Sequence, residues 1–383
     1  MRVRYFERSP GTWRLRIERG RDAEGRRLFS YETVKGTADD AARRRFELLQ
    51  AHDEGTFAAP DRVTVAAFFE RWVAQQLALR EIGRSSAENY HLMFRCYVRD
   101  ALGGVKLQKV AAGQIQGLYT ELLTKQRTTG RVLSVSSVLH VHRILAAMFR
   151  AARKARLIKV NPMDEVTPPR KPKVRPKAID AAGVATVLDA LKGTWRYPIA
   201  FLDFVTGLRR GELLGLRWKD VDLAGARLHV QGQIVQYADG SLEWRAPKTE
   251  SGVRVVSLPA EAVDMLRQLR RDAAEARMRG GLGGGLDDAP VFTLDGANPI
   301  RPDVVSHGFN KACRALGLAT TFHGMRHTHA TDLLQKVGKA GAKAVSQRLG
   351  HADITTTLAV YQRVVEGDDR ELAELSRGIL GGR

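Results

Sequence analysis

Histidine, arginine and tyrosine side chains gather in one stretch near the end of the chain. It begins with His323-Gly-Met-Arg326, continues to Leu349-Gly-His351 and ends at Tyr361. Arg326 starts a series of apolar residues at helical spacing, which predicts the buried side of a helix: Ala330, Leu333, Leu334 and Val337. An arginine beside that buried side needs an anionic partner, because an unpaired charge is costly to bury. The stretch therefore predicts an anion-binding site.

The charge of the chain favours a polyanion as the partner. The 383 residues include 62 Lys and Arg against 42 Asp and Glu, a formal net charge of +20. Residues 61–160 hold 17 of these basic residues and only six acidic ones. Such a distribution indicates nucleic acid first and a membrane surface second. No apolar run approaches the length of a spanning helix, and the N-terminus has no signal-peptide core.

Cysteine and histidine spacings do not predict a metal site. Cys96 and Cys313 lie far apart, so we expect buried free thiols in a reducing compartment. Four histidines fall in the C-terminal stretch, but no carboxylate or cysteine spacing supports a cluster around them: His323, His327, His329 and His351. We expect His327 and His329 to be polar packing residues.

Residues 1–57 predict a small α+β domain with a three-stranded sheet and one helix. Trp13, Leu15 and Ile17 alternate with polar residues, the period of a half-buried strand. Thr37 is a candidate N-cap for a helix over residues 37–52. The sheet-facing residues of this helix would be Ala41, Phe46 and Leu49. Six arginines would share the opposite face of the sheet: Arg14, Arg16, Arg19, Arg21, Arg26 and Arg27. That face is either a solvated basic surface or one that enters the DNA major groove.

Residues 62–160 predict an all-α domain. Apolar periodicity indicates helices over 64–80, 86–100, 114–125 and 135–157. The first would bury Val65, Phe68, Phe69, Trp72, Val73 and Leu77. Each cation of the domain alone is typical of an ordinary surface charge, and only their total indicates phosphate contacts. The candidates are Lys106, Lys109, Lys125, Arg127, Arg131, Arg143 and Arg150.

A basic, proline-rich linker is predicted over residues 161–178. Its five prolines favour an extended, semi-rigid chain. Its cations would let it follow a phosphate backbone: Arg170, Lys171, Lys173, Arg175 and Lys177. Residues 179–365 then combine helices with strand-like runs at 226–236, 242–245 and 253–258, and Asp239-Gly240 marks a hairpin turn. We expect a mixed, mainly α domain with a small β-sheet, followed by a tail over 366–383.

Four boxes in this last half resemble the catalytic domain of tyrosine site-specific recombinases, the phage-integrase family. They are Thr206-Gly-Leu-Arg209-Arg-Gly-Glu212, Lys248 in a turn, His323-Gly-Met-Arg326, and Leu349-Gly-His351 with Tyr361. Four boxes in the right order are far more specific than any one of them. The helical domain resembles the family's core-DNA-binding domain, and residues 1–57 resemble the arm-binding domain of three-domain integrases. The resemblance thus covers nearly the whole chain.

The resemblance also implies a role for each box residue. Arg209 and Arg326 would hold the non-bridging oxygens of the scissile phosphate with their planar guanidinium groups. Tyr361 would be the nucleophile and His323 the candidate base. The supporting roles fall to three residues: His351 would donate a hydrogen bond to the phosphate, Lys248 would protonate the departing 5′-oxygen, and Glu212 would brace Arg209. Neither a metal nor another cofactor is required. Lys219 is a distant rival of Lys248.

Such an enzyme would integrate or excise a mobile element through a 3′-phosphotyrosyl intermediate and a Holliday junction. The family implies a homotetramer on double-stranded DNA with core and arm attachment sites, in the cytoplasm of a bacterial host. Accessory DNA-bending and directionality proteins are further possible partners. One alternative is a type IB topoisomerase-like enzyme that relaxes DNA, and another is a non-catalytic DNA-binding regulator. The arm-like domain and the tail argue against the first, and the intact set of boxes argues against the second.

Overall fold

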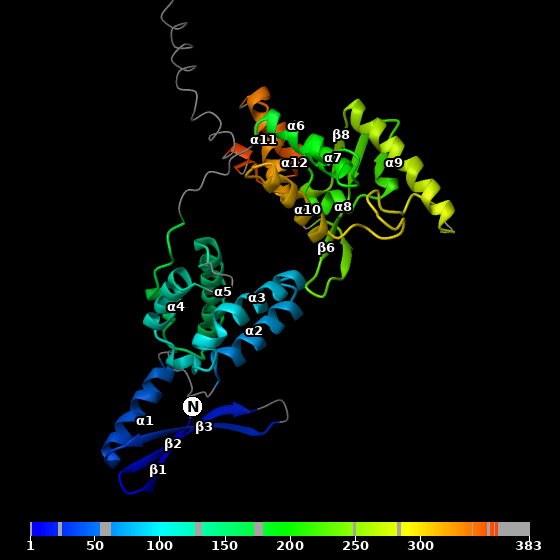
Figure 1. Cartoon of the computed structure of the whole chain (residues 1–383). Helices are drawn as coiled ribbons and strands as arrows, with labels where there is room; N and C mark the ends of the chain where they lie inside the picture. The colour runs from blue at the N-terminus through cyan, green and yellow to red at the C-terminus, as the bar shows by residue number, and fades with distance from the viewer. Residues whose placement is uncertain are drawn as a thin grey trace, which may run out of the picture. The chain divides into compact units, whose positions relative to one another are not determined.

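The computed structural model describes residues 2–21, 25–53, 63–126, 132–171, 179–247, 250–281, 285–338, 340–350, 353–355 and 357–358. The chain divides into two compact units, Met1–Lys173 and Val174–Arg383 (Figure 1). No described helix is long and apolar enough to cross a membrane.

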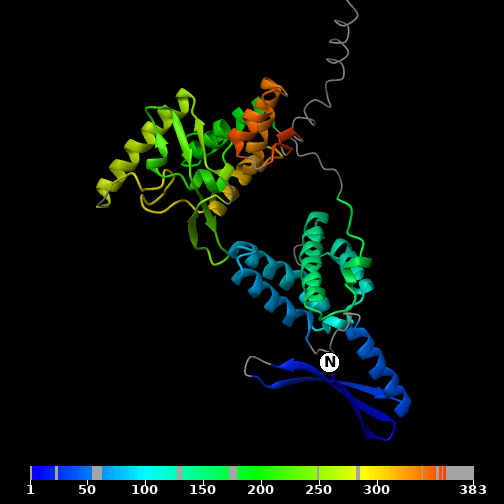
Figure 2. The ribbon, with the colours of Figure 1, turned by 180° about the vertical axis from the view of Figure 1, so that it is seen from behind.

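The first unit opens with a three-stranded antiparallel sheet. Its order is β1-β2-β3, from β1 (Val3–Ser9), β2 (Thr12–Arg21) and β3 (Arg27–Lys35). Helix α1 (Ala38–Asp53) packs beside the twisted sheet, as both views show (Figure 2). The side chains of Leu15 and Ile17 are fully buried, so the predicted alternation of β2 is confirmed.

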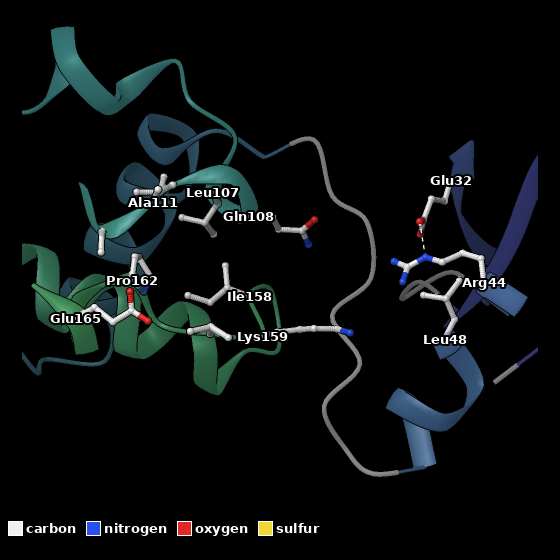
Figure 3. Close-up of a pocket in the computed structure, with 13 residues that line it drawn as sticks. Glu32, Arg44, Leu48, Leu107, Gln108, Ala111, Ile158, Lys159, Pro162 and Glu165 are labelled. Atoms are coloured by element: carbon white, nitrogen blue, oxygen red, sulfur yellow. Dashed lines mark hydrogen bonds and ion pairs between the residues drawn. The ribbon is translucent and has the colours of Figure 1, made fainter. Parts of the chain in front are cut away.

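Two polar contacts fix α1 at its start and along its length. Thr37 Oγ1 accepts a hydrogen bond from the Asp40 N–H (3.3 Å), while the Thr37 N–H donates to the Asp40 carboxylate (2.9 Å). Thr37 therefore caps the helix as predicted. Further along, Arg44 Nε donates to Glu32 Oε1 on β3 (2.8 Å), the ion pair drawn in Figure 3 among the residues that line a pocket of this unit.

The sheet-facing side of α1 differs from the prediction at one position. Ala41 is buried and Leu49 packs at the edge of the same core, but Phe46 is 68% exposed and Leu48 is buried in its place. Ala41 and Leu48 are seven residues apart, two turns of a helix, so they lie on one face. Phe46 falls outside that face, and its predicted burial is wrong.

The rest of the first unit is an α-helical bundle, as the periodicity predicted. Its helices are α2 (Val65–Ala78), α3 (Arg84–Tyr97), α4 (Ala112–Thr124) and α5 (Val135–Lys154). The rings of Phe69 and Phe94 stack in its core with centroids 4.0 Å apart. Leu77, predicted to be buried, is 42% exposed because it lies in the last turn of α2, beside the turn that leads to α3. Cys96 is exposed, which corrects its predicted burial, whereas Cys313 is buried.

Packing continues into the segment that was predicted as a linker. Asn161 caps the short helix η3 (Pro162–Glu165), and its Oδ1 accepts the Met163 N–H (3.1 Å). Met163 and Val166 belong to the core of the helical bundle. Residues 161–166 are therefore part of that bundle, because their apolar side chains complete its core.

The described part of the second unit combines helices with two small antiparallel sheets. The helices are α6 (Ala181–Leu191), α7 (Tyr197–Thr206), α8 (Arg210–Leu214), α9 (Ala260–Arg279), α10 (Pro302–Ala315), α11 (Phe322–Val337) and α12 (Ala342–Leu349). One sheet has the order β4-β5-β8, and the other is the hairpin β6-β7. The strands are β4 (Val221–Asp222), β5 (Arg227–Val230), β6 (Gln233–Gln236), β7 (Leu242–Arg245) and β8 (Arg254–Ser257).

The architecture confirms the predicted fold class, with one refinement. The strand-like run at 226–236 is two strands, β5 and β6, that belong to different sheets. The turn at Asp239-Gly240 lies between β6 and β7, where Gly240 has a φ of 82°. The separation of residues 1–57, 62–160, 179–365 and 366–383 into functional domains stays a prediction.

Replacing Leu48 by Ala should loosen the N-terminal sheet, whereas replacing Phe46 by Ala should not. Truncating a buried leucine costs about 2–5 kcal/mol, and an exposed position typically changes stability by less than about 0.5 kcal/mol. Hydrogen exchange of the Leu15 and Ile17 amides in the full chain measures this difference. Equal acceleration by both variants would contradict the packing of α1 described above.

Candidate active site

Arg326 lies on the buried side of α11, close to its start. Thr321 caps the helix, and its Oγ1 accepts the Gly324 N–H (3.1 Å). The Arg326 guanidinium donates to the carbonyl oxygens of Gly207 (2.5 Å) and Leu349 (2.7 Å). Burial first, and then the charge of Arg209, lowers the pKa of Arg326 to about 10. Among the described residues no carboxylate forms an ion pair with it, and backbone carbonyls are its hydrogen-bond acceptors there.

The apolar series behind Arg326 is mostly buried. Ala330 and Leu334 lie in a small core between α11 and α12, and Leu333 packs against it. Val337 is 46% exposed, so its predicted burial is wrong. It is the last residue of α11 and precedes Gly338, where the helix ends.

Arg209 is held at the start of α8 by Glu212. Helix α7 ends at Gly207, whose φ of 65° turns the chain toward Arg209. The Glu212 carboxylate accepts the Arg209 N–H (2.9 Å) and Arg209 Nη1 (2.7 Å), and Arg209 Nη2 donates to the Gly350 carbonyl (2.8 Å). The Arg209 side chain remains 40% exposed. The guanidinium is thus anchored by protein groups, while part of the side chain is accessible to solvent.

A third arginine, Arg254, completes this group and was not predicted from the sequence. Its Nη2 and Nη1 donate to the two Glu212 oxygens (2.9 and 3.3 Å), and its Nε donates to the Arg348 carbonyl (2.7 Å). Burial alone would raise the pKa of the Glu212 carboxyl, but Arg254 and then Arg209 outweigh it and hold that pKa below its usual value. The one available signal was an arginine within the apolar run Val253, Val255, Val256.

The three arginines converge on the end of α12. Consecutive carbonyl oxygens of Arg348, Leu349 and Gly350 accept from Arg254, Arg326 and Arg209, respectively. A helix C-terminus carries partial negative charge, which favours cations there. Figure 1 shows α7, α11 and α12 beside one another in this part of the unit. The end of α12 therefore fixes all three guanidinium groups.

Two histidines of α11 differ in their surroundings. His323 is partly exposed, and its ring meets the His327 ring edge to face with centroids 5.0 Å apart. Partial burial, then His327, Arg326 and Arg209, lower the pKa of His323, which favours the neutral ring. His329 is buried against the Phe204 ring, and burial followed by the charge of Arg348 lowers its pKa to about 4. His329 is thus a packing residue, as expected.

The remaining site candidates divide into described and undescribed residues. Lys248, His351 and Tyr361 lie outside the described residues, as do Arg131, Lys173 and Arg175. Lys219, the rival of Lys248, forms an ion pair with Asp288. Arg210, the neighbour of Arg209, donates to Ser306 on α10 (2.5 Å). The structure therefore brings Arg209, Arg326, Glu212 and His323 together.

The exposed face of the N-terminal sheet carries stacked arginine–aromatic pairs. Arg14 lies over the Tyr31 ring at 4.3 Å and Arg16 over the Phe29 ring at 4.9 Å. Tyr31, Phe29 and Phe6 are all exposed on the sheet. Stacking fixes these guanidinium groups while leaving donors for an anion. Sequence reasoning identified the arginines but not the aromatic residues that hold them.

Comparisons with known proteins agree with this geometry. Residues 178–367 match the model of the phage integrase family. A "Tyrosine recombinase XerC-like" protein of Caldanaerobacter subterraneus is 25% identical over 382 residues, which cover 95% of each chain. An integrase of Streptomyces ambofaciens is 27% identical, over 92% of this chain and 89% of its own.

Solved structures show the same fold. The Tn1549 transposon integrase in complex with a circular intermediate DNA has a TM-score of 0.65 at 22% identity, over 81% of this chain and 99% of that one. A lambda integrase tetramer bound to a Holliday junction has a TM-score of 0.56 at 19% identity, over 93% of this chain and 94% of that one.

A mainly helical unit with arginines fixed at the meeting of α8, α11 and α12 defines the catalytic domain of a DNA breaking-and-rejoining enzyme of the tyrosine recombinase class. Residues 178–367, which carry this site, belong to the phage integrase family.

Buried His329 should make stability depend on pH. Its folded pKa of about 4 lies below the ordinary 6.5, so the unfolded chain binds a proton first as the pH falls. The stability contribution is complete above pH 6.5 and is lost on acidification toward pH 4, by up to about 3 kcal/mol. Urea unfolding at several pH values should show a shallower pH dependence for His329→Asn. The exposed His307 offers a control, and a slope unchanged by His329→Asn would contradict this assignment.

Proposed function

We propose that this enzyme performs site-specific recombination that integrates or excises a mobile element. The observation that carries the proposal is the pair Arg209 and Arg326, held 2.8 and 2.7 Å from consecutive carbonyls at the end of α12. Two fixed guanidinium groups suit the two non-bridging oxygens of one phosphodiester. A topoisomerase-like or purely regulatory function is less well supported, because the relatives named for their activity are recombinases and integrases.

The chemistry that fits these residues is transesterification. The Tyr361 oxygen bonds to phosphorus as the bond to the 5′-oxygen breaks, and the phenol proton passes to His323. A free phenol has a pKa of about 10, and His323 is a weak base because its own pKa is lowered. His323 can therefore take the Tyr361 proton only if nearby cations also favour the phenolate. Lys248 supplies a proton to the 5′-oxygen, and His351 donates a hydrogen bond to the phosphate. The phosphotyrosyl link retains the bond energy until the second strand attacks.

Arg209 and Arg326 contribute most in the transition state, where the phosphate oxygens gain negative charge. Preorganised donors in a site that excludes water are strong there, and losing one costs roughly 10²–10³ in rate. Arg326 is buried, so its charge meets the phosphate with little screening by solvent.

DNA binding is divided among the parts of the chain in this proposal. Residues 62–160, which carry most of the net positive charge, bind the core site, and residues 1–57 bind separate arm sites. The basic segment 161–178 follows the backbone, with Lys171 one of its cations. Four copies act on two duplexes through a Holliday junction, as in the lambda integrase tetramer, and the tail 366–383 packs on a neighbouring copy. DNA-bending and directionality proteins assist, and the reaction takes place in the cytoplasm of a bacterial host.

A nicked suicide substrate tests the chemistry directly. DNA that flanks the gene supplies the attachment core, and a nick near the cleavage point traps the covalent adduct. Wild type should form a protein–DNA adduct that denaturing gels detect, and Tyr361→Phe should abolish it with little change in DNA affinity. Adduct formation by the Phe variant would identify another nucleophile. No adduct with wild type on its cognate site would favour the regulatory function.

The arginine–aromatic face of the N-terminal sheet should bind arm DNA. Arg14→Gln combined with Arg16→Gln removes two cations. The slope of arm-DNA affinity against salt concentration should then fall by the amount expected for about two phosphate contacts. Fluorescence anisotropy with DNA that includes the flanking arms, at several salt concentrations, measures this slope. Arg43→Gln on α1, whose side chain is 72% exposed, is a matched control. If the double variant lost as much affinity for DNA that contains only the core site as for DNA with the arms, the assignment to arm DNA would be contradicted.

A further inference from the structure

Arg254 lies inside the active site without an assigned role. It is the first residue of β8, and its side chain is only 7% exposed. Besides the Glu212 carboxylate and the Arg348 carbonyl, its guanidinium donates to the Gly252 carbonyl (3.1 Å). Its Nε and both Nη atoms thus all donate to protein acceptors, and it can bind a DNA phosphate only by giving up one of these bonds. Any contribution to cleavage must act through the residues it contacts.

The Glu212 carboxylate is the first of these residues. It is buried, and it accepts from Arg209 Nη1 at 2.7 Å and from Arg254 Nη2 at 2.9 Å. If Glu212 met Arg209 alone, the two charges would cancel beside the phosphate site. With Arg254 present, two cations share one anion and the group retains a net charge of +1. Because the group is largely buried, this difference is weakly screened.

The end of α12 is the second contact. Arg254 Nε binds the Arg348 carbonyl, one residue before the carbonyl that binds Arg326 and two before the one that binds Arg209. Arg254 therefore holds the same backbone that fixes both arginines assigned to the phosphate. An arginine is suited to this double task because its Nε and its fork of Nη atoms bind different partners at once.

We propose that Arg254 is a positioning residue for strand cleavage, which shares the Glu212 carboxylate so that Arg209 keeps its positive charge toward the scissile phosphate. The role rests on the proposed contact between Arg209 and that phosphate. Two properties of Arg254 would contribute to this role. Its charge balances Glu212, and its forked guanidinium links Glu212 to the end of α12.

Three variants of the full chain distinguish these properties. Arg254→Met removes charge and fork, Arg254→Lys keeps the charge without the fork, and Arg254→Met with Glu212→Gln removes both opposite charges together. The measured quantities are the single-turnover rate of adduct formation on saturating suicide substrate and the dissociation constant for the same DNA. Arg227→Met, at an exposed arginine on the neighbouring strand β5, is the matched control.

Arg254→Met should slow cleavage at least about tenfold, less than the roughly 10²–10³ for losing a direct donor, with less than a threefold change in affinity. Arg254→Lys should fall between wild type and Met. The decisive result is recovery: the Met and Gln double variant should cleave faster than Arg254→Met alone, because Arg209 regains an uncancelled charge. A purely structural role for Arg254 predicts the opposite, since a second buried polar change adds damage. Arg227→Met should cleave at the wild-type rate.

Two results would overturn the role of Arg254 alone. One is a wild-type cleavage rate for Arg254→Met, and the other is a double variant no faster than Arg254→Met. A wild-type enzyme that forms no adduct on its attachment DNA would instead overturn the proposed function, and this role with it. The wild-type reaction therefore separates the two failures within one experiment.

Discussion

The catalytic unit depends on one buried carboxylate, that of Glu212. Buried guanidinium groups are costly unless an anion or well-placed acceptors compensate them. Glu212 compensates Arg209 and Arg254 directly, and the end of α12 supplies acceptors for both and for Arg326. Removing the carboxylate would leave cations facing one another across a buried space. These contacts hold the arginines in one arrangement, which is what electrostatic preorganisation requires.

Two glycines in left-handed conformation connect this electrostatic arrangement to the chain. Gly207 ends α7 at a φ of 65° and Gly350 ends α12 at a φ of 67°. Their carbonyls accept from Arg326 and Arg209, respectively. A Cβ on Gly207 would lie 2.5 Å from Cδ2 of His329. Glycine is thus required at 207 by both backbone conformation and space, and the same turn that ends a helix presents an acceptor to the buried Arg326.

The sequence predicted well whatever depends on local pattern. Amphipathic helices and the alternating strand β2 appeared where expected, because each presents one buried face to a core. The sequence pattern was less informative where packing against distant residues decides between two alternatives. Phe46 and Leu48 both suit a helix, and only the position of the sheet decides that Leu48 is buried. Residues 226–236 read as one strand because sheet membership depends on distant partners.

Arg254 escaped prediction for a related reason. An arginine at the start of a strand ordinarily lies in solvent, and its partner Glu212 is 42 residues away along the chain. The family boxes point to residues that are expected to touch the phosphate, but they carry no information on the residues that hold them. Residues that hold the box residues in place can be identified only when interatomic distances are known.

Charge is used in two different ways along this chain. Residues 61–160 carry an excess of cations, whereas residues 179–383 hold 27 basic and 24 acidic residues and are nearly neutral overall. A diffuse positive surface attracts DNA of any sequence, and this attraction weakens as the salt concentration rises. In the second unit three arginines, Arg209, Arg254 and Arg326, are instead fixed at one place by hydrogen bonds to the end of α12. Binding strength spread over the whole substrate would stabilise ground state and transition state alike and would not accelerate cleavage. A nearly neutral second unit that gathers three arginines at the end of one helix, two of them paired with one carboxylate, concentrates positive charge at a single place. Such preorganised charge favours a transition state over a ground state.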